Sequence, residues 1–265
     1  MENGNSTENI IVVKIGGSTL GNEDTSLEDI AELAHRGFKV VVVHGGGASI
    51  SEWLGRIGLP ARFSRGLRVT DRQTMEVVTM VLAGKVNKEL VARLSTLGVR
   101  AVGLSGADAA ILKGHPLDPE LGLVGEVTQV DPEVLRILVS SGYVPVVAPI
   151  AVSEDGDLLN VNADTAAAEL AVALKAHKAV FLTDVAGVKG ADGTLLPLLT
   201  PEEVKVLIDN GVITGGMIPK VEACLRAAEA ASSVHIMNAG TLRALSDAVL
   251  SGKCSGTTIA ASRAQ

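Results

Sequence analysis

The sequence predicts an α/β protein whose mainly parallel sheet is covered by helices on both faces, and three observations indicate this. Apolar runs rich in β-branched residues alternate with helix-like segments along almost all of the 265 residues, the order of elements that such proteins have. The first run, residues 10–15, leads directly into two glycines, and the second, residues 40–43, is followed by His44 and three glycines, as at tight strand-to-helix turns. Because the chain has 29 glycines but only 2% aromatic residues, its core must be aliphatic.

Helices are expected where a capping residue precedes an apolar stripe. Ser26 is a suitable N-cap for a helix through residue 36, and Thr70 or Asp71 caps a long helix to about residue 97. The first half of that long helix is apolar on nearly every side, so a second partner is expected to cover it. Further helices are expected at about residues 48–57, from 131 with a proline in the start, in the alanine-rich stretch to about 176, from 200 in a capping box, and directly after the glycines 215–216.

The remaining strands are expected in short apolar runs at residues 99–104, 144–148, 179–183, 234–237 and 257–259. Hairpins are expected at residues 111–129 and around 154–157, and residues 61–70 form a loop or a short hairpin. No linker rich in proline or serine divides the chain. We therefore expect a disordered tail over residues 1–9 and a single domain over residues 10–265, with a division into two lobes near residue 175.

The overall composition excludes several classes of protein. A formal net charge of -7 argues against a nucleic-acid-binding surface. No apolar run approaches the roughly 20 residues of a membrane helix, and residues 1–9 lack the apolar core of a signal peptide. Cys224 and Cys254 provide no disulfide framework and are expected to be reduced thiols. These features predict a soluble, cytoplasmic protein with neither nucleic acid nor membrane as a partner.

The first strand carries a charge where a strand buried on both faces should have none. Lys14 stands near its carboxyl end, just before Gly16 and Gly17, and the second strand ends in His44 followed by the glycines 45–47. Ligands of open parallel sheets bind outside the carboxyl ends of the strands. Two glycine turns that expose N–H groups, with one lysine between them, therefore predict a phosphate site.

Familiar nucleotide motifs do not explain this phosphate site. The sequence has neither the P-loop pattern nor G-x-G-x-x-G, no cysteine–histidine cluster with metal-ligand spacing, and no G-x-S-x-G. Phosphoryl transfer requires positioning and positive charge rather than covalent help. Lys14 and Lys220 would supply that charge, and an aspartate between them, Asp164, would hold both ammonium groups in place and keep them protonated.

Each candidate also has a purely structural explanation. The lysines and Arg68 could be solvated surface charges, and Asn160 and Asp164 could be turn and capping residues. His44 is expected to fix its loop or to stay neutral in the packing rather than to act in catalysis. The coincidence of all these residues at strand ends and helix starts favours a site.

The sequence at this point resembles a known family. The motifs that carry the resemblance are, in order, Lys14-Ile15-Gly16-Gly17-Ser18, His44-Gly45-Gly46-Gly47, Gly66-Leu67-Arg68-Val69-Thr70-Asp71, Ala83-Gly84-Lys85-Val86-Asn87-Lys88, Asn160-Val161-Asn162-Ala163-Asp164 and Gly215-Gly216-Met217-Ile218-Pro219-Lys220. They resemble the amino acid kinase superfamily and, within it, the N-acetylglutamate kinases. The resemblance implies a three-layer αβα sandwich with a mainly parallel, eight-stranded central sheet. It also implies transfer of the γ-phosphate of MgATP to the side-chain carboxylate of N-acetyl-L-glutamate, which gives N-acetyl-L-glutamyl 5-phosphate in arginine biosynthesis.

The resemblance also implies roles for individual residues. Lys14 and Lys220 would neutralise the phosphoryl group during transfer, and Asp164 would organise both lysines. The acceptor would be bound in a lobe of about residues 10–175, by Gly45, Gly46, Arg68 and Asn160. ATP would be bound chiefly in a lobe of about residues 176–265, and its residues would be Gly16, Gly17, Thr183, Asp184, Gly187, Gly216 and Lys220. Mg²⁺ would arrive with ATP, so no metal site on the protein is expected.

The quaternary structure is expected to be a homodimer. A second copy would cover the apolar surface of the long helix, where Ala83 and Gly84 are small enough to let the copies approach closely. A hairpin at residues 111–129 could cover that surface instead, but the resemblance favours the dimer. Relatives inhibited by arginine have a kinked N-terminal helix, whereas the first strand here begins by residue 10. We therefore expect that arginine does not inhibit this protein.

Three other functions are open at this stage. A kinase of the same superfamily could act on aminoadipate or glutamate linked to a carrier protein, in lysine or ornithine biosynthesis, although the motif at residues 66–71 favours free acetylglutamate. An oxidoreductase with an atypical dinucleotide site would need a ribose-binding acid where the sequence has His44 and glycines. A non-catalytic ligand sensor of the same fold would have no need of both lysines and Asp164.

Overall fold

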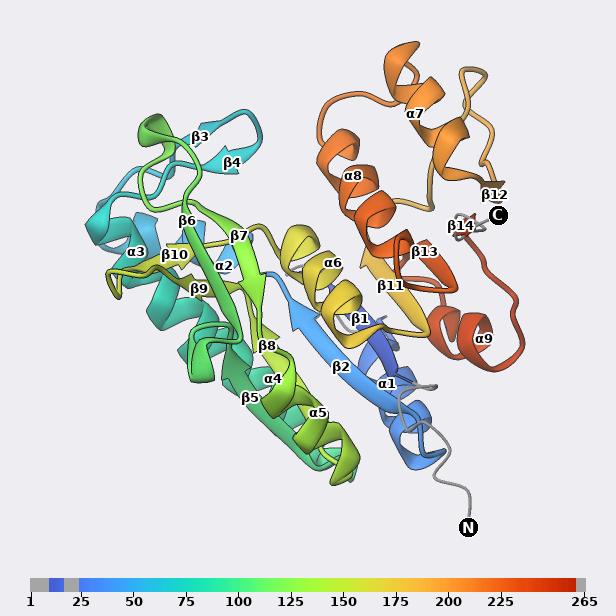
Figure 1. Ribbon diagram of the computed structural model, residues 1–265, viewed down its shortest axis with the longest axis horizontal. Coiled ribbons are helices and arrows are strands. Elements are labelled where there is room, and N and C mark those ends of the chain that lie inside the picture. The colour runs from blue at the N-terminus through green and yellow to red at the C-terminus, as the bar shows by residue number, and fades with distance from the viewer. Residues whose placement is uncertain (1–9, 17–23, 261–265) are drawn as a thin grey trace.

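The computed structural model describes residues 10–16 and 24–260, and its centre is an eight-stranded sheet (Figure 1). The strands follow one another across the sheet in the order β12-β14-β13-β11-β1-β2-β8-β5. Neighbouring strands are parallel except β13 and β14. Their bounds are β1 Ile10–Ile15, β2 Lys39–His44, β5 Ala101–Ser105, β8 Val144–Ala148, β11 Lys178–Thr183, β12 Leu198–Leu199, β13 Ser233–Asn238 and β14 Thr257–Ala260.

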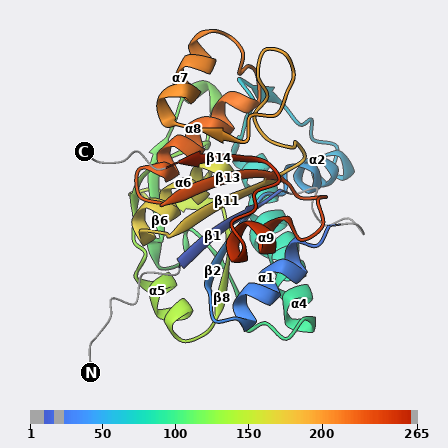
Figure 2. The same ribbon diagram turned by 90° about the vertical axis from the view of Figure 1, so that its right-hand side faces the viewer.

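Helices cover both faces of this sheet (Figure 2). The first helical layer packs on one face and consists of α5 Glu133–Ser140, α6 Ala163–Leu174 and α8 Met217–Ala228, with α7 Pro201–Asp209 against α8. The second layer consists of α1 Ser26–His35, α4 Asn87–Thr96 and α9 Ala244–Leu250, with α2 Gly47–Arg56 and α3 Arg72–Thr79 beside α4. The predicted three-layer αβα sandwich with a mainly parallel, eight-stranded sheet is therefore confirmed.

The central strands divide their side chains between two cores because successive residues of a strand point to opposite faces. Val12 of β1 packs in the core under α6, whereas Val13 and Val42 pack in the core under α1 and α4. The same alternation assigns Lys14 to the α6 face. It assigns His44, at the end of β2, to the opposite face, which α4 covers.

A smaller sheet and a hairpin stand beyond the carboxyl end of β8, at one end of the molecule (Figure 1). The smaller sheet has the order β10-β9-β6-β7, with β6 Leu112–Pro116, β7 Gly125–Val130, β9 Ile150–Val152 and β10 Leu158–Asn160. The hairpin consists of β3 Phe63–Ser64 and β4 Leu67–Arg68. The expected hairpins are confirmed, but the pairing of β6 with β9 that joins two of them into one sheet was not predicted.

Two helix starts differ from the predicted ones by one residue. Helix α1 begins at Ser26 itself, and Thr25 occupies the N-cap position. The reason is that the carboxylate of Asp24 accepts the N–H of Ser26, at 2.8 Å. In α5 the proline is the N-cap residue rather than the first helical residue, and the preceding Asp131 accepts the N–H of Glu133 at 3.0 Å.

The long helix after Thr70 is confirmed, but its interior was not predicted. Asp71 caps α3, with its Oδ1 accepting the N–H of Thr74 at 2.8 Å. A π-helical segment, η1 Met80–Val86, then leads into α4. The apolar residues of this segment face in several directions: Leu82 is buried, whereas Met80 is 63% exposed. Two 3₁₀ turns complete the described elements, η2 Asp108–Ala110 and η3 Pro119–Leu121.

Three expectations from the sequence, on the N-terminal tail, on arginine and on the two lobes, stay predictions. The tail at residues 1–9 lies outside the described residues, and arginine insensitivity stays a prediction. The division near residue 175 falls between α6 and β11 and also stays a prediction. Among the described helices, none is long and apolar enough to cross a membrane.

Candidate active site

Three ionisable side chains from three elements meet at the carboxyl edge of the large sheet. Lys14 comes from β1, Asp164 from the first turn of α6, and Lys220 from the first turn of α8. The Nζ atom of Lys14 lies 2.9 Å from Oδ1 of Asp164, and that of Lys220 lies 2.9 Å from Oδ2. Helix α6 packs on both β1 and α8, so the fold itself brings together what we call the Lys–Asp–Lys cluster.

The Lys–Asp–Lys cluster is buried and carries an excess of positive charge. Its side chains are only 10–13% exposed. Burial raises the pKa of Asp164 and is the largest single influence, but the charges and hydrogen bonds of Lys14 and Lys220 outweigh it and lower that pKa. Asp164 is therefore ionised at neutral pH. One negative charge against two positive ones, in a site with little water, favours an anionic ligand.

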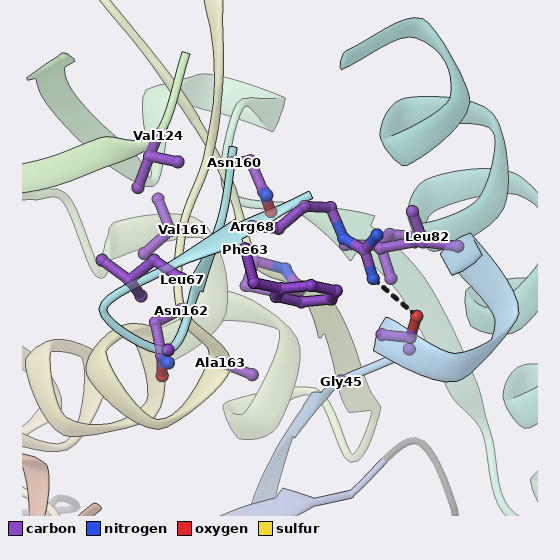
Figure 3. Close-up of a pocket in the computed structure, with 15 residues that line it drawn as sticks. Gly45, Phe63, Leu67, Arg68, Leu82, Val124, Asn160, Val161, Asn162 and Ala163 are labelled. Carbon is purple, nitrogen blue, oxygen red and sulfur yellow. Dashed lines mark hydrogen bonds between the residues drawn. The ribbon is translucent and has the colours of Figure 1, made fainter. Parts of the chain in front are cut away.

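A first cavity of about 670 Å³, open to solvent, adjoins this cluster. It is bounded by the glycine loop after β2, the β3–β4 hairpin and the start of α6 (Figure 3). Ala163 lines it and directly precedes Asp164, which places the Lys–Asp–Lys cluster at its edge. Among the described residues that line it, Arg68 is the one with a full charge. The first cavity therefore suits an anion as well.

Arg68 is held rigidly from three sides. Its Nη2 donates to the carbonyl of Gly47 at 2.8 Å and to the hydroxyl of Ser51 at 2.9 Å. The ring of Phe63, from the facing strand of the hairpin, lies 4.7 Å from the guanidinium carbon. Nη1 is buried and has no hydrogen-bond partner in the described structure. A buried guanidinium with a free donor is a suitable receptor for a carboxylate.

Thr70 determines which way the amide of Asn160 faces. The Thr70 hydroxyl donates to the carbonyl of Arg68 at 2.7 Å, because a carbonyl can only accept. The same hydroxyl therefore accepts from Nδ2 of Asn160, at 3.0 Å. Asn160 lines the first cavity, and its remaining acceptor, Oδ1, is free to receive a donor. Arg68 and Asn160 together thus offer a cation and a hydrogen-bond acceptor.

The glycine loop after β2 lies so close to η1 that a side chain at Gly46 would displace Leu82. A Cβ atom on Gly46 would stand 2.5 Å from Cδ2 of Leu82. The N–H of Gly45 continues the ladder between β1 and β2 by donating to the carbonyl of Ile15 at 3.0 Å. Helix α2 starts at Gly47, so the N–H groups of its first turn have no partner within the helix. Gly45 and Gly46 both line the first cavity.

A second cavity, of about 840 Å³, lies in the other half of the molecule. Two segments line it, residues 184–189 after β11 and residues 212–217 before and at the start of α8, with mostly apolar side chains. Gly187 has φ +150°, and a Cβ there would stand 2.6 Å from the hydroxyl of Thr257, so only glycine fits. Since α8 begins at Met217 and carries Lys220, the Lys–Asp–Lys cluster connects to this cavity too.

The structure places the remaining predicted residues as follows. Asp184 and Gly187 line the second cavity, whereas Thr183 and Gly216 flank it, the former donating to the Asp184 carboxylate at 2.9 Å. Gly16 directly follows β1. Gly17 lies outside the described residues. Within the part that the structure describes, no group of three or more acidic, histidine or cysteine side chains could hold a metal ion.

Sequence reasoning missed several residues that build this site. Thr70 and Asn87 stand inside recognised motifs, but nothing in the sequence pairs them with Asn160 and His44, their actual partners. No pattern in the sequence indicated that the ring of Phe63 would lie over the Arg68 guanidinium. Arg68 was identified because the motif at residues 66–71 resembles that of the family, and this motif does not include Phe63.

Comparison with known proteins adds an independent result. The family model described as the amino acid kinase family matches residues 9–238. Acetylglutamate kinase of Methanothrix thermoacetophila is 44% identical over 246 residues, which cover 87% of this chain and 85% of that protein. Acetylglutamate kinase of Dehalococcoides mccartyi is 41% identical, with 98% of this chain and 97% of that protein covered. The crystal structure of smu.665 from Streptococcus mutans has a TM-score of 0.82 at 33% identity and covers 96% of this chain and 99% of that one.

Proposed function

The chain belongs to the amino acid kinase family, and on that basis we propose how its cavities and its Lys–Asp–Lys cluster work together. The reaction is the ATP-dependent phosphorylation of the side-chain carboxylate of N-acetyl-L-glutamate, in arginine biosynthesis. The observation that carries the proposed mechanism is the buried Lys–Asp–Lys cluster, whose Asp164 directly follows a lining residue of the first cavity in α6 and whose Lys220 lies one helical turn from a lining residue of the second in α8.

The first cavity would bind acetylglutamate. Arg68 would hold the carboxylate next to the acetamido group through the free Nη1 donor, and Oδ1 of Asn160 would accept the amide N–H. The side-chain carboxylate would then extend toward the glycine loop, where Gly46 presents its backbone N–H. The N–H of Gly45, which was also expected to bind substrate, is instead engaged by the carbonyl of Ile15. This arrangement explains why the cavity combines one cation with one fixed acceptor.

The second cavity would bind ATP. Its apolar lining suits a purine ring, and Asp184 at its rim could accept from a ribose hydroxyl. The phosphates would run toward the start of α8 and the glycines after β1. We propose that Mg²⁺ arrives bound to the phosphates of ATP, since kinase sites bind this ion largely through substrate phosphates rather than in a cage made of protein ligands alone.

The chemistry would then require charge compensation rather than proton transfer. An oxygen of the ionised side-chain carboxylate attacks the γ-phosphorus, the bond to the bridging oxygen of ADP breaks, and ADP leaves with that electron pair. Both reactants are anions, so their approach is opposed by their charge. Lys14 and Lys220 would offset this repulsion, and Asp164, already ionised and engaged with both, would keep them in position without acting as a base.

We propose that two copies of the chain form a dimer in the cytoplasm. Strand β5 lies at the edge of the large sheet, and Ala101–Leu104 in it are all partly exposed. Beside it, η1 leaves Met80 63% exposed. An open strand edge with a neighbouring apolar helix is suited to two-fold pairing. Sedimentation at micromolar concentration should give twice the chain mass, and Met80→Glu should shift it toward the monomer.

The activity itself can be tested with purified protein. ADP formation should depend on N-acetyl-L-glutamate, and L-glutamate or L-aminoadipate at the same concentration should give little. Lys205→Ala changes an exposed lysine of α7. It is the control that shows whether a substitution outside the two cavities affects the measured activity. ADP release that requires a carrier-protein-linked substrate, with none from free acetylglutamate, would reassign the acceptor.

A further inference from the structure

We propose that His44 is a positioning residue of the first cavity: its buried ring fixes the Gly45–Gly46 peptide so that the N–H of Gly46 faces the reacting groups. The inference rests on the proposed function, because it concerns the site where the acceptor and phosphoryl group would meet. His44 itself is only 1% exposed and does not line the first cavity, so it would act through the peptide rather than on the substrate.

Gly45 is held on both sides, in two successive peptide planes. Its N–H, in the plane before Gly45, donates to the carbonyl of Ile15 on the neighbouring strand at 3.0 Å. Its carbonyl, in the plane that also carries the N–H of Gly46, lies 2.9 Å from Nδ1 of His44. Peptide bonds among the described residues are all trans, and in a trans peptide the carbonyl and the following N–H point in opposite directions. With the Gly45 carbonyl turned to the buried ring, the N–H of Gly46 is turned away from it. The structure records no acceptor for that N–H among the residues it describes.

The hydrogen-bond network fixes the proton on His44. Because the Gly45 carbonyl can only accept, Nδ1 carries the hydrogen and Nε2 is left as an acceptor. Nε2 accepts a hydrogen bond from Nδ2 of Asn87 at 3.1 Å. The amide of Asn87 has no freedom to turn over. Its Nδ2 also donates to the carbonyl of Val146 at 2.8 Å, and its Oδ1 accepts from Lys88 at 3.0 Å.

His44 is therefore a neutral, single-tautomer ring anchored to the sheet through α4. Burial lowers the pKa of His44 to about 4, its hydrogen bond with Gly45 opposes that shift, and the charge of Lys88 adds to it. A second ring proton would also face the N–H donors of Asn87. The chain Lys88–Asn87–His44–Gly45 thus runs without a break from a surface lysine to the wall of the first cavity.

The orientation of the Gly46 N–H matters because the charge that develops on the phosphoryl group in the transition state is best stabilised by donors that are already in position. Loss of a single such donor typically lowers turnover about a hundredfold to a thousandfold. Replacing His44 would leave the donor present but free to turn, so we expect a smaller loss in kcat, roughly tenfold to a hundredfold. The KM for ATP should change less than about twofold, because the second cavity is untouched.

The experiment compares substitutions of two buried histidines. His44→Leu removes the hydrogen bond to Gly45, whereas His44→Asn restores an N–H close to the position of Nδ1. His235→Leu is the matched control: that residue is 4% exposed, and burial and Lys178 lower its pKa to about 4 as well. The hydrogen bonds that the described residues make to its ring come from the hydroxyls of Ser233 and Thr258. All variants are measured for kcat, both KM values and Tm.

We expect His44→Leu and His235→Leu to lower Tm similarly, and only His44→Leu to lower kcat. His44→Asn should recover most of that kcat even if its Tm stays low. Equal kcat losses in His44→Asn and His44→Leu, or a comparable loss in His235→Leu, would mean that His44 serves packing alone. Wild-type turnover of acetylglutamate tests the proposed function separately. If it were absent, the amide NMR shift of Gly46 in His44→Leu against the wild type would still report on the peptide.

Discussion

In the first cavity a buried hydrogen-bond network holds the polar side chains of Arg68 and Asn160 in place among glycines and apolar residues, whereas the second cavity is bounded by two chain segments with mostly apolar side chains. Arg68 and Asn160 are tied together through Thr70, and the glycine loop is tied to α4 through His44. The second cavity has fewer such ties; its shape depends on Gly187 and on the hydroxyl of Thr257, which accepts the N–H of Val188 at 2.8 Å. Recognition by fixed side chains should be more sensitive to single substitutions than recognition by backbone and apolar area.

The largest effect is expected where the two halves meet. Lys220→Ala removes a cation that serves the transition state, so kcat should fall about a hundredfold to a thousandfold while both KM values change little. Steady-state kinetics with each substrate varied in turn would measure this, with Lys205→Ala as the control. A folded Lys220→Ala protein with near-normal kcat would remove the Lys–Asp–Lys cluster from the mechanism.

Asp164→Asn distinguishes an organiser from a base at the same junction. It keeps the shape but leaves Lys14 and Lys220 without their shared counterion. We expect kcat to fall by a similar order, about a hundredfold, with no loss of an ionisation from the pH–rate profile. A basic limb that is present in the wild type and absent in Asp164→Asn would instead assign Asp164 as a general base.

The Lys–Asp–Lys cluster was predictable from the sequence, while much of the first cavity was not. Lys14 is conspicuous as a charge in a buried strand, and the carboxyl edge of a parallel sheet is a general place for ligands. The family resemblance then indicated Asp164 and Lys220 as its partners. Thr70 and Asn87 are different, since each has a role only through a partner 90 or 43 positions away. Such pairing depends on tertiary packing that local patterns do not contain.

Two features of the fold, the π-helical segment and the start of α1, were not predicted for the same reason. The sequence places strands and most helix caps well because their signals are local. The π-helical turn at Met80–Val86 changes the hydrogen-bond register without changing the apolar pattern, so periodicity gave no sign of it. The start of α1 was misjudged by one residue because Asp24, one position before Thr25, already satisfies the N–H of Ser26.

A conservative change at Arg68 should affect the KM for acetylglutamate, which the first cavity would bind, and leave the KM for ATP nearly unchanged. Arg68→Lys keeps the charge but loses the fork that bonds Gly47 and Ser51 while leaving Nη1 free. We expect the KM for acetylglutamate to rise about tenfold to a hundredfold, the usual range for a charged hydrogen bond. The KM for ATP should remain within about twofold. Equal rises in both values would show that Arg68 stabilises the fold rather than reads the acceptor.

Acid should weaken both halves through their buried histidines. Burial lowers the pKa values of His44 and His235 to about 4, whereas the unfolded chain titrates near 6.5. The unfolded state therefore binds more protons between these values, so the stability contribution is complete above about pH 6.5 and is lost as the pH falls toward 4. Between pH 7 and pH 5 the free energy of unfolding should fall by about 2 kcal/mol for each histidine. The free energy of unfolding of His44→Asn, of His235→Asn and of the wild type can be measured by urea titration at pH 7 and pH 5. The decrease between the two pH values should be smaller in each variant by about 2 kcal/mol.

The smallest effects are expected from two buried threonines, and they test the comparison most directly. Thr70 and Thr257 are both fully buried, and each hydroxyl donates to one carbonyl and accepts one N–H. Thr70→Val leaves the Asn160 amide without its partner, so the KM for acetylglutamate should rise about fivefold to tenfold. Thr257→Val frees the N–H of Val188 beside the second cavity, so the KM for ATP should rise instead, by about threefold.

The two threonine variants control for each other because they remove the same atoms from equally buried positions. Both should lower Tm, and serine at either position should restore the affected KM, since it returns the hydroxyl without the methyl group. If Thr70→Val raised both KM values equally, the Thr70–Asn160 contact would be part of general packing and not of acceptor binding. If Thr257→Val left the KM for ATP unchanged, the loop at residues 184–189 would hold its shape without that hydroxyl. The second cavity would then be even less dependent on single side chains than the contrast with the first cavity implies.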